Sequence, residues 1–308
     1  MRISKFYKGL FLQNTNLLPA VRDVLNFSNE DRCLFILKER WFPYPIAKNI
    51  LNELEFHLKH PKKSRMPGRL IVGGTNNGKT SIINKFIRSH QPYDDENVKI
   101  IPVISAKAPE SSSISDLYGV LLYELGIPYR NTDRVNKKRE QVQEIFALCQ
   151  IKMLIIDELH NILVASVPKQ KAFMVALKNL SNELMMPIIL VGTADALHAI
   201  NSDAQLSNRF SPLVLPRWQY TDDYKALLAS IEATLPLHKE SNIAATEEIA
   251  LYILDQSEGY IGEIIDFVNY AARYAIENKI EKINMDSLKN CGFVKPSMRK
   301  NIANLIDI

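Results

Sequence analysis

The segment that most constrains this chain is an eight-residue run at residues 73–80, Gly-Gly-Thr-Asn-Asn-Gly-Lys-Thr. It matches G-x-x-x-x-G-K-[ST] at every fixed position, between an apolar strand pattern at residues 70–72 and a helical pattern. Its glycines let the backbone wrap a phosphate, so that N–H groups point at the anion. Lys79 then reaches the β- and γ-phosphates, and the Thr80 hydroxyl ligates Mg²⁺. The run predicts a P-loop that binds ATP and Mg²⁺ through Gly73, Gly74, Thr75, Asn76, Asn77, Gly78, Lys79, Thr80 and Ser81.

A second motif lies where an apolar strand pattern, residues 153–156, ends in Asp157 and Glu158. We expect Asp157 to hold Mg²⁺ with Thr80, and Glu158 to orient or deprotonate the water that attacks the γ-phosphate. Such a pair can also simply cap the next helix, but the P-loop favours the catalytic interpretation. Glu158 and Lys79 are therefore candidate catalytic residues. The second acid disfavours a small-molecule kinase, which needs an acceptor hydroxyl and not a positioned water.

Strand and helix patterns alternate through the first two thirds of the chain, which predicts an α/β fold with a parallel sheet covered by helices. The expected strands are residues 70–72, 98–105, 153–156, 187–191 and 213–215. After Trp218 the patterns are helical, which predicts a small all-α lid domain. We expect four parts: an N-terminal extension at 1–40, the α/β nucleotide-binding domain at 41–218, the lid at 219–290 and a C-terminal tail at 291–308.

Composition narrows the class of protein further. The chain is 46% hydrophobic and 23% charged, as globular proteins are, and no apolar run is long enough to span a bilayer. Its three cysteines are scattered, which argues against a disulfide framework or a zinc site. We therefore expect a cytoplasmic protein without a membrane partner. The net charge is only +4, so a nucleic-acid partner has to be met by local basic patches.

The succession of P-loop strand, acid-pair strand and all-α lid resembles the AAA+ ATPases. The resemblance implies that Thr193, after the fourth strand, touches the γ-phosphate, with a turn or cap role as the alternative. It implies that Arg209 is an arginine finger acting on a neighbouring subunit's nucleotide, with an ion-paired surface arginine as the alternative and Arg217 next in line. Tyr44 lies where the adenine is usually gripped, although core packing explains it equally well. The lid carries Glu263 where many AAA+ proteins have an arginine, so we expect no arginine sensor there.

Four groups of basic residues are candidates for DNA phosphate contacts, with ordinary solvated surface as the alternative for each. Lys107 follows the second strand, where the loop of an AAA+ subunit can face the centre of a ring. The other three groups are residues 59–65, then Arg130, Arg134, Lys137, Lys138 and Arg139, and finally Lys295, Arg299 and Lys300. Binding of this kind is phosphate-led, sensitive to salt and indifferent to sequence.

Short runs across residues 41–275 resemble the TniB/TnsC family, the AAA+ regulators of DNA transposition. The most discriminating runs are the two asparagines before Gly78, Asp-Glu-Leu-His-Asn at 157–161 and Arg-Met-Pro at 65–67. The resemblance implies assembly on double-stranded DNA as ATP-bound rings or helical filaments. It further implies a target signal from a TniQ-type adaptor, recruitment of a transposase and disassembly by ATP hydrolysis.

Two other classes of protein share parts of this pattern. An AAA+ replication initiator or helicase loader is the main alternative, although no helix-turn-helix of convincing length follows the lid pattern. A metabolic P-loop kinase or GTPase needs an acceptor site or a guanine-reading loop, and the sequence shows neither. The transposition regulator is therefore the favoured interpretation.

Overall fold

The computed structural model of the protein describes residues 16–96 and 98–299, which form parts of two compact units. One unit is Ile46–Pro216, and the other combines Met1–Pro45 with Arg217–Ile308. Residues 16–45 differ from the expectation, because they pack with the C-terminal helices and do not form a separate extension or the start of the α/β domain.

The α/β unit is built on a five-stranded parallel sheet in the order β4-β5-β6-β1-β7. The strands are β1 (Gly68–Gly73), β4 (Val103–Lys107), β5 (Met153–Asp157), β6 (Ile188–Gly192) and β7 (Phe210–Leu215). In register, Val72 lies beside Gly192, and Lys107 lies beside Asp157. The carboxyl ends of these parallel strands therefore meet at one edge of the sheet, which brings the P-loop and the acid pair together. The expected parallel sheet is confirmed.

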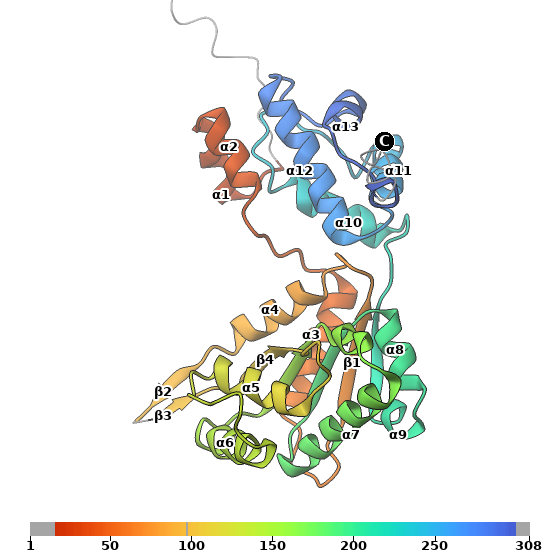
Figure 1. The fold of residues 1–308 in the computed structure, drawn as a ribbon. Coiled ribbons are helices and arrows are strands. Elements are labelled where there is room, and N and C mark those ends of the chain that lie inside the picture. Colours follow the sequence, from red (N-terminus) through yellow and green to blue (C-terminus); the bar gives the residue numbers. More distant parts are fainter. Residues whose placement is uncertain (1–15, 97, 300–308) are drawn as a thin grey trace, which may run out of the picture. The chain divides into compact units, whose positions relative to one another are not determined.

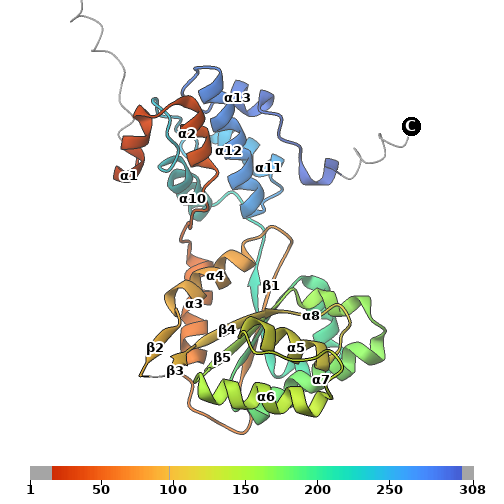
Figure 2. The ribbon, with the colours of Figure 1, turned by 60° about the vertical axis from the view of Figure 1, so that its left-hand side comes forward.

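Helices cover both faces of this sheet (Figure 2). On one side lie α3 (Pro45–Leu58) and α4 (Lys79–Ser89). On the other lie α5 (Ile114–Glu124), α6 (Val135–Leu148), η2 (Leu159–Val164), α7 (Val167–Glu183), α8 (Ala194–Asn201) and α9 (Ala204–Ser207). Because strand side chains alternate between faces, Leu70, Leu154 and Leu190 join one buried cluster with Leu121 and Phe173 of these helices.

Two local features of the α/β unit were not expected. The predicted strand at 98–105 is divided by Pro102 into β3 (Val98–Ile100) and β4. Proline has no N–H to donate, and here only its carbonyl takes part, accepting from the N–H groups of Lys152 and Met153. β3 instead pairs with β2 (Tyr93–Asp95) in an antiparallel hairpin that extends beyond the main sheet (Figure 1). The second feature is α6, which lies where only a basic cluster was expected.

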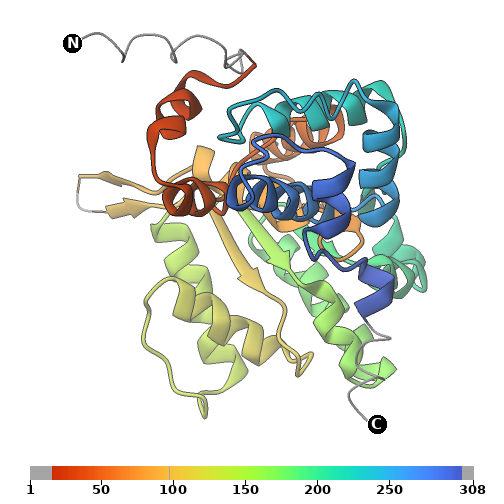
Figure 3. The same cartoon turned by 90° about the horizontal axis from the view of Figure 1, so that it is seen from above.

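The helical unit joins segments from the two ends of the chain. It contains α1 (Pro19–Arg22), η1 (Asp23–Asn26), α2 (Asn29–Ile36), α10 (Asp222–Glu232), α11 (Glu247–Gln256), α12 (Ile261–Glu277) and α13 (Met285–Asn290). α2 packs against α12 (Figures 1 and 3). Buried Arg32 donates to the Pro236 carbonyl at 3.0 Å and to the Glu281 carboxylate at 3.0 Å. Across the residues described, no helix is both long and apolar enough to cross a membrane.

Candidate nucleotide site

The P-loop lies between the end of β1 and the first residue of α4, Lys79. Gly78 has φ +82°, in the left-handed region that side chains other than glycine rarely adopt. Gly73 is closely packed, since an added Cβ would lie 3.0 Å from the Cβ of Leu215. The local structure therefore favours glycine at both fixed positions, at Gly78 because of its conformation and at Gly73 because of the close packing. Both glycines also leave room for a phosphate.

Asn77 has a structural function that the sequence did not reveal. Its side chain is 3% exposed and donates from Nδ2 to the carbonyls of Leu215 at 2.8 Å and Pro216 at 3.1 Å. These bonds tie the P-loop to the end of β7, 138 residues further along the chain. The Asn77 side chain therefore stabilises the loop, whereas the motif assigns phosphate binding to the backbone N–H groups of the loop.

Lys79 is held inside its own loop. Its Nζ donates to the carbonyls of Gly73 at 3.0 Å and Gly74 at 2.7 Å. Burial lowers the pKa of this ammonium, while the charges of Glu158 and Asp157 act in the opposite direction. The positive charge therefore lies within the cradle where the motif places the phosphates.

Thr80 and Asp157, the two predicted magnesium ligands, are brought together. The Thr80 hydroxyl donates to Asp157 Oδ2 at 3.1 Å, across 77 residues of sequence. Asp157 is 7% exposed, and its Oδ1 accepts from the Glu158 N–H at 2.7 Å. A hydroxyl and a carboxylate are hard oxygen donors of the kind that Mg²⁺ prefers. The pair therefore fits the ion.

Glu158 follows in a left-handed conformation, with φ +56°. This unusual conformation for a residue with a side chain is typical of functional sites. Its Oε2 lies 3.1 Å from His160 Nε2, and both side chains are partly exposed. His160 Nδ1 is buried and has no hydrogen-bond partner among the described residues. His160 lies in the Asp-Glu-Leu-His-Asn run of the sequence, but only its distance to Glu158 identifies it as part of this site.

Thr193 lies between the end of β6 and Ala194, the first residue of α8, at the same edge of the sheet as the P-loop. Its hydroxyl does not cap the helix, so the simple capping alternative is not realised in this conformation. Thr193 Oγ1 is also buried without a hydrogen-bond partner in the described part of the chain. Burying a hydroxyl unpaired is costly, so this atom fits a ligand that supplies an acceptor. Together with Lys79, Thr80 and Asp157, it indicates that the residues present fit ATP with Mg²⁺.

Arg209 does not lie free on the surface. It is 5% exposed, and its guanidinium donates to Ser181 Oγ at 2.6 Å and to Asn182 Oδ1 at 2.9 Å at the end of α7. Burial lowers its pKa, and the neighbouring charge of Arg65 acts in the same direction. The surface ion pair considered as the alternative is likewise not formed, because both partners are neutral. Its assignment as an arginine finger stays a prediction.

Three residues considered for nucleotide contacts belong to the helical unit. Tyr44 is buried with its ring 5.1 Å from that of Trp218, and burial raises its pKa to about 12. Its role as an adenine contact stays a prediction. Glu263 is buried and accepts from Arg299 at 3.0 and 2.5 Å. Arg217 is exposed, with its guanidinium 4.5 Å from the centroid of the Tyr260 ring.

The candidate DNA-contacting residues divide by exposure. Lys107, Arg130, Arg134 and Lys137 are exposed, and Lys137 pairs with Asp133 at 2.9 Å. Lys138 is only 2% exposed, because α6 turns it inward. Its Nζ donates to Ser115 Oγ and to the Asn131 carbonyl, both at 3.3 Å, so it is not presented to a phosphate in this conformation.

Several residues of the remaining basic groups form ion pairs with acidic side chains. Lys295 pairs with Asp255 at 3.0 Å, and Arg299 is bound to Glu263. Arg139 lies 3.8 Å from Glu183. Lys300 lies outside the described residues. In the 59–65 group, the side chains of Lys59, Lys62, Lys63 and Arg65 are exposed.

Comparisons with solved structures agree with an AAA+ fold. The chain is similar to Cdc6p from Pyrobaculum aerophilum (TM-score 0.61, 15% identity, 83% of this chain and 69% of that chain). It is similar to Aeropyrum pernix ORC1 in complex with DNA (TM-score 0.58, 12% identity, 88% and 69%). It is also similar to Drosophila ORC bound to DNA (TM-score 0.58, 12% identity, 94% and 70%). Identities this low show the fold alone.

The sequence itself gives the family. No curated protein matches it significantly. A family model described as Bacterial TniB protein matches residues 32–220, which is more than half of the chain and includes both the P-loop and the acid pair. The match confirms the resemblance found in the sequence, and this chain belongs to the bacterial TniB family.

Proposed function

We propose that this chain is an ATP-dependent regulator of DNA transposition that assembles on double-stranded DNA and is released by ATP hydrolysis. The observation that carries the proposal is the group formed at one edge of the sheet by Lys79, Thr80, Asp157, Glu158 and the unpartnered Thr193 hydroxyl. Each of these side chains has the chemistry that ATP binding and hydrolysis require at that place.

The proposed chemistry follows from the atoms at hand. Lys79 exchanges its hydrogen bonds to the Gly73 and Gly74 carbonyls for the β- and γ-phosphate oxygens. Thr80 and Asp157 hold Mg²⁺, which neutralises phosphate charge when bound. Glu158 accepts a proton from, or orients, the attacking water, and Thr193 donates its free hydroxyl to the γ-phosphate. These proximity and charge effects are the main sources of catalysis in phosphoryl transfer.

The proposed DNA contacts use the exposed cations Lys107, Arg130, Arg134 and Lys137. The ORC relatives in the comparisons are described with DNA, which supports DNA binding by this chain. Membership of the TniB family supports the further partners, a TniQ-type adaptor upstream and a transposase downstream. ATP then acts as a timer, because the assembly persists only until the nucleotide is hydrolysed.

The decisive experiment is electron microscopy of the purified chain with linear duplex DNA, with ATP, with a slowly hydrolysed ATP analogue and without nucleotide. We expect rings or filaments around the duplex that require nucleotide and persist with the analogue. Lys79→Ala is the matched variant, because it removes the phosphate-binding ammonium, and it should abolish both nucleotide binding and assembly. Particles that ignore DNA under all conditions would contradict the regulator, and assembly by Lys79→Ala would contradict the coupling to ATP.

A further inference from the structure

The α/β unit has a large cavity at the opposite edge of the sheet from the nucleotide site. Its volume is about 1070 Å³, and it lies where β4, β5 and β6 begin. Lys152, which lines it, is five residues before Asp157 along the same strand direction, a separation of about 16 Å. The cavity is therefore a site of its own, and no step proposed for ATP uses its residues.

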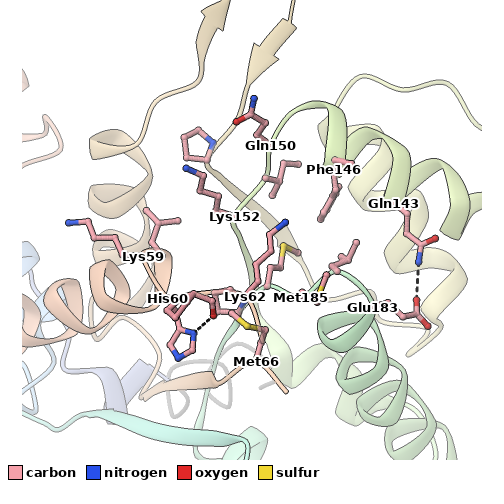
Figure 4. A pocket seen from close by; sticks show the side chains of 18 of the residues that line it. Lys59, His60, Lys62, Met66, Gln143, Phe146, Gln150, Lys152, Glu183 and Met185 are labelled. Atoms are coloured by element: carbon pink, nitrogen blue, oxygen red, sulfur yellow. Dashed lines mark hydrogen bonds between the residues drawn. The ribbon is translucent and has the colours of Figure 1, made fainter. Parts of the chain in front are cut away.

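One wall of this cavity is apolar. It includes Phe146 and Met66, which are labelled in Figure 4, and Met186, and all three side chains are buried. Met185 stands out because it is 43% exposed and has φ +46°. It directly follows the last turn of α7, where glycine is favoured in the left-handed conformation. A methionine is thus kept in an unfavourable conformation that leaves a flexible apolar side chain at the cavity.

The rim of the cavity is positively charged. Lys59 and Lys62 come from the loop after α3, where Lys59 also pairs with Glu55 at 3.5 Å, and Lys152 directly precedes β5 (Figure 4). Among the lining residues that the structure describes, the one carboxylate is Glu183, which accepts from Gln143 at 3.1 Å. This combination suits a ligand that carries carboxylates beside bulky apolar side chains.

We propose that this cavity is a docking site for a short segment of a partner protein in which acidic residues flank a large aliphatic or aromatic side chain. The apolar side chain packs on the exposed side chain of Met185, and the carboxylates pair with the exposed Lys62 and Lys152. A DNA backbone would satisfy the lysines but leave the exposed side chain of Met185 without an apolar partner, so the peptide accounts for more of the surface. A cavity of this volume also admits several side chains at once.

The test begins with a phage-displayed library of random twelve-residue peptides, selected on the full chain. Enriched peptides are synthesised with a fluorescent label, and their affinities are measured by anisotropy. We expect Asp or Glu next to Leu, Phe or another bulky apolar residue. Affinity should fall at least tenfold for Lys62→Glu/Lys152→Glu, and it should be unchanged for Lys171→Glu, an exposed lysine of α7 outside the cavity. Unchanged binding of a fluorescent ATP analogue shows that each variant is folded.

Met185→Gly separates docking from folding. Glycine accepts φ +46° readily, so this variant should unfold at the same temperature or higher, while peptide affinity falls several-fold because the apolar contact is gone. Selected peptides without the acidic and apolar pattern, or peptides that bind both variants as well as the natural chain, would overturn the proposal. Loss of duplex DNA binding by the lysine variant with unchanged peptide binding would also overturn it and assign these lysines to DNA. None of these readouts depends on ATP turnover.

Discussion

At the scale of single residues, the two acids that end β5 have different environments despite being adjacent. Asp157 is buried and hydrogen bonded to Thr80, whereas Glu158 is partly exposed and lies beside His160. The buried acid is placed to hold a cation, and the accessible one is placed to meet water. This difference supports separate roles for the pair.

Glu158→Gln should bind ATP normally and lose hydrolysis. The amide keeps the size of the side chain but cannot accept a proton, so we expect turnover to fall about a hundredfold or more. Nucleotide affinity and DNA-bound assembly should be retained, and the assemblies should outlast those of the natural chain. Phosphate release and filament lifetime measure the two effects, with Glu144→Gln, an exposed acid of α6, as the control. Rapid turnover by Glu158→Gln would remove Glu158 from catalysis.

Arg209 and Arg217 should respond differently to truncation. Arg209→Ala removes the charged hydrogen bonds to Ser181 and Asn182, although Ser181 keeps its bond to the Met186 carbonyl, and this should cost about 1–3 kcal/mol of folding free energy. Arg217→Ala removes an exposed side chain, so thermal unfolding should change little while ATP turnover in the DNA-bound assembly falls. Unfolding temperatures and DNA-stimulated turnover of both variants distinguish the roles. Full stability with lost turnover in Arg209→Ala would instead identify Arg209 as the finger.

At the scale of elements, α2 owes its place to a residue far away in the sequence. A helix of eight residues is marginal alone, so its position has to come from tertiary contacts. Arg32 supplies them by reaching Pro236 and Glu281, the latter 249 residues away. The segment before the α/β unit is thereby built into the helical unit.

Arg32→Met should destabilise the helical unit by about 3–5 kcal/mol, because it breaks the ion pair and leaves the Glu281 carboxylate with the long 3.3 Å hydrogen bond from the His238 N–H. Burial alone would raise the pKa of Glu281, but the hydrogen bond and charge of Arg32, together with the smaller effects of His238, outweigh it and hold the pKa below its ordinary value. The stabilisation is therefore full above pH 4.5 and is lost as pH falls through the lower folded-state pKa.

Chemical denaturation across pH 3–6 checks both parts of this prediction, which rests on the ion pair in the helical unit. Arg32→Met should lose stability at neutral pH and show less acid dependence than the natural chain. Lys38→Met, at an exposed lysine just beyond the same helix, is the control. Equal stability of the Arg32 and Lys38 variants would show that the ion pair contributes nothing net.

At the scale of the whole molecule, the question is which basic surface faces DNA. The structure leaves Lys107, Arg130 and Arg134 exposed and turns Lys138 into the interior. We expect Lys107→Glu and Arg130→Glu/Arg134→Glu to weaken binding to any duplex sequence. Each lost phosphate contact should also reduce the slope of log affinity against log salt by about 1.

Fluorescence anisotropy with a labelled duplex at several salt concentrations measures both quantities. Lys279→Glu changes an exposed lysine of the helical unit by the same charge and is the control for net charge. If it weakens binding as much as the other variants, the attraction is a property of total charge. Unchanged affinity and salt slope in both sets of variants would show that Lys107, Arg130 and Arg134 do not contact DNA.

Much of the fold and of the nucleotide site could be predicted because the signals are local. The P-loop is one continuous segment, and the acid pair directly follows its strand. A parallel sheet places strand ends at one edge, so adjacency of Thr80 and Asp157 follows from the strand pattern. The helix α6 was missed because a run of basic residues resembles solvated surface, whereas burial of Lys138 depends on Ser115, Asn131 and the Tyr129 ring.

The sequence by itself determined the nucleotide-binding core and the family, because eight contiguous residues and a strand with two acids carry that chemistry without reference to the rest of the chain. Only the tertiary structure decided which polar residues are used internally: Arg209 against α7, Asn77 on β7 and Arg32 on Glu281. It also decided that Met185 lines a cavity with lysines from distant segments. The reason is physical: a side chain's desolvation and hydrogen-bond partners are set by residues that chain folding, not sequence proximity, brings beside it.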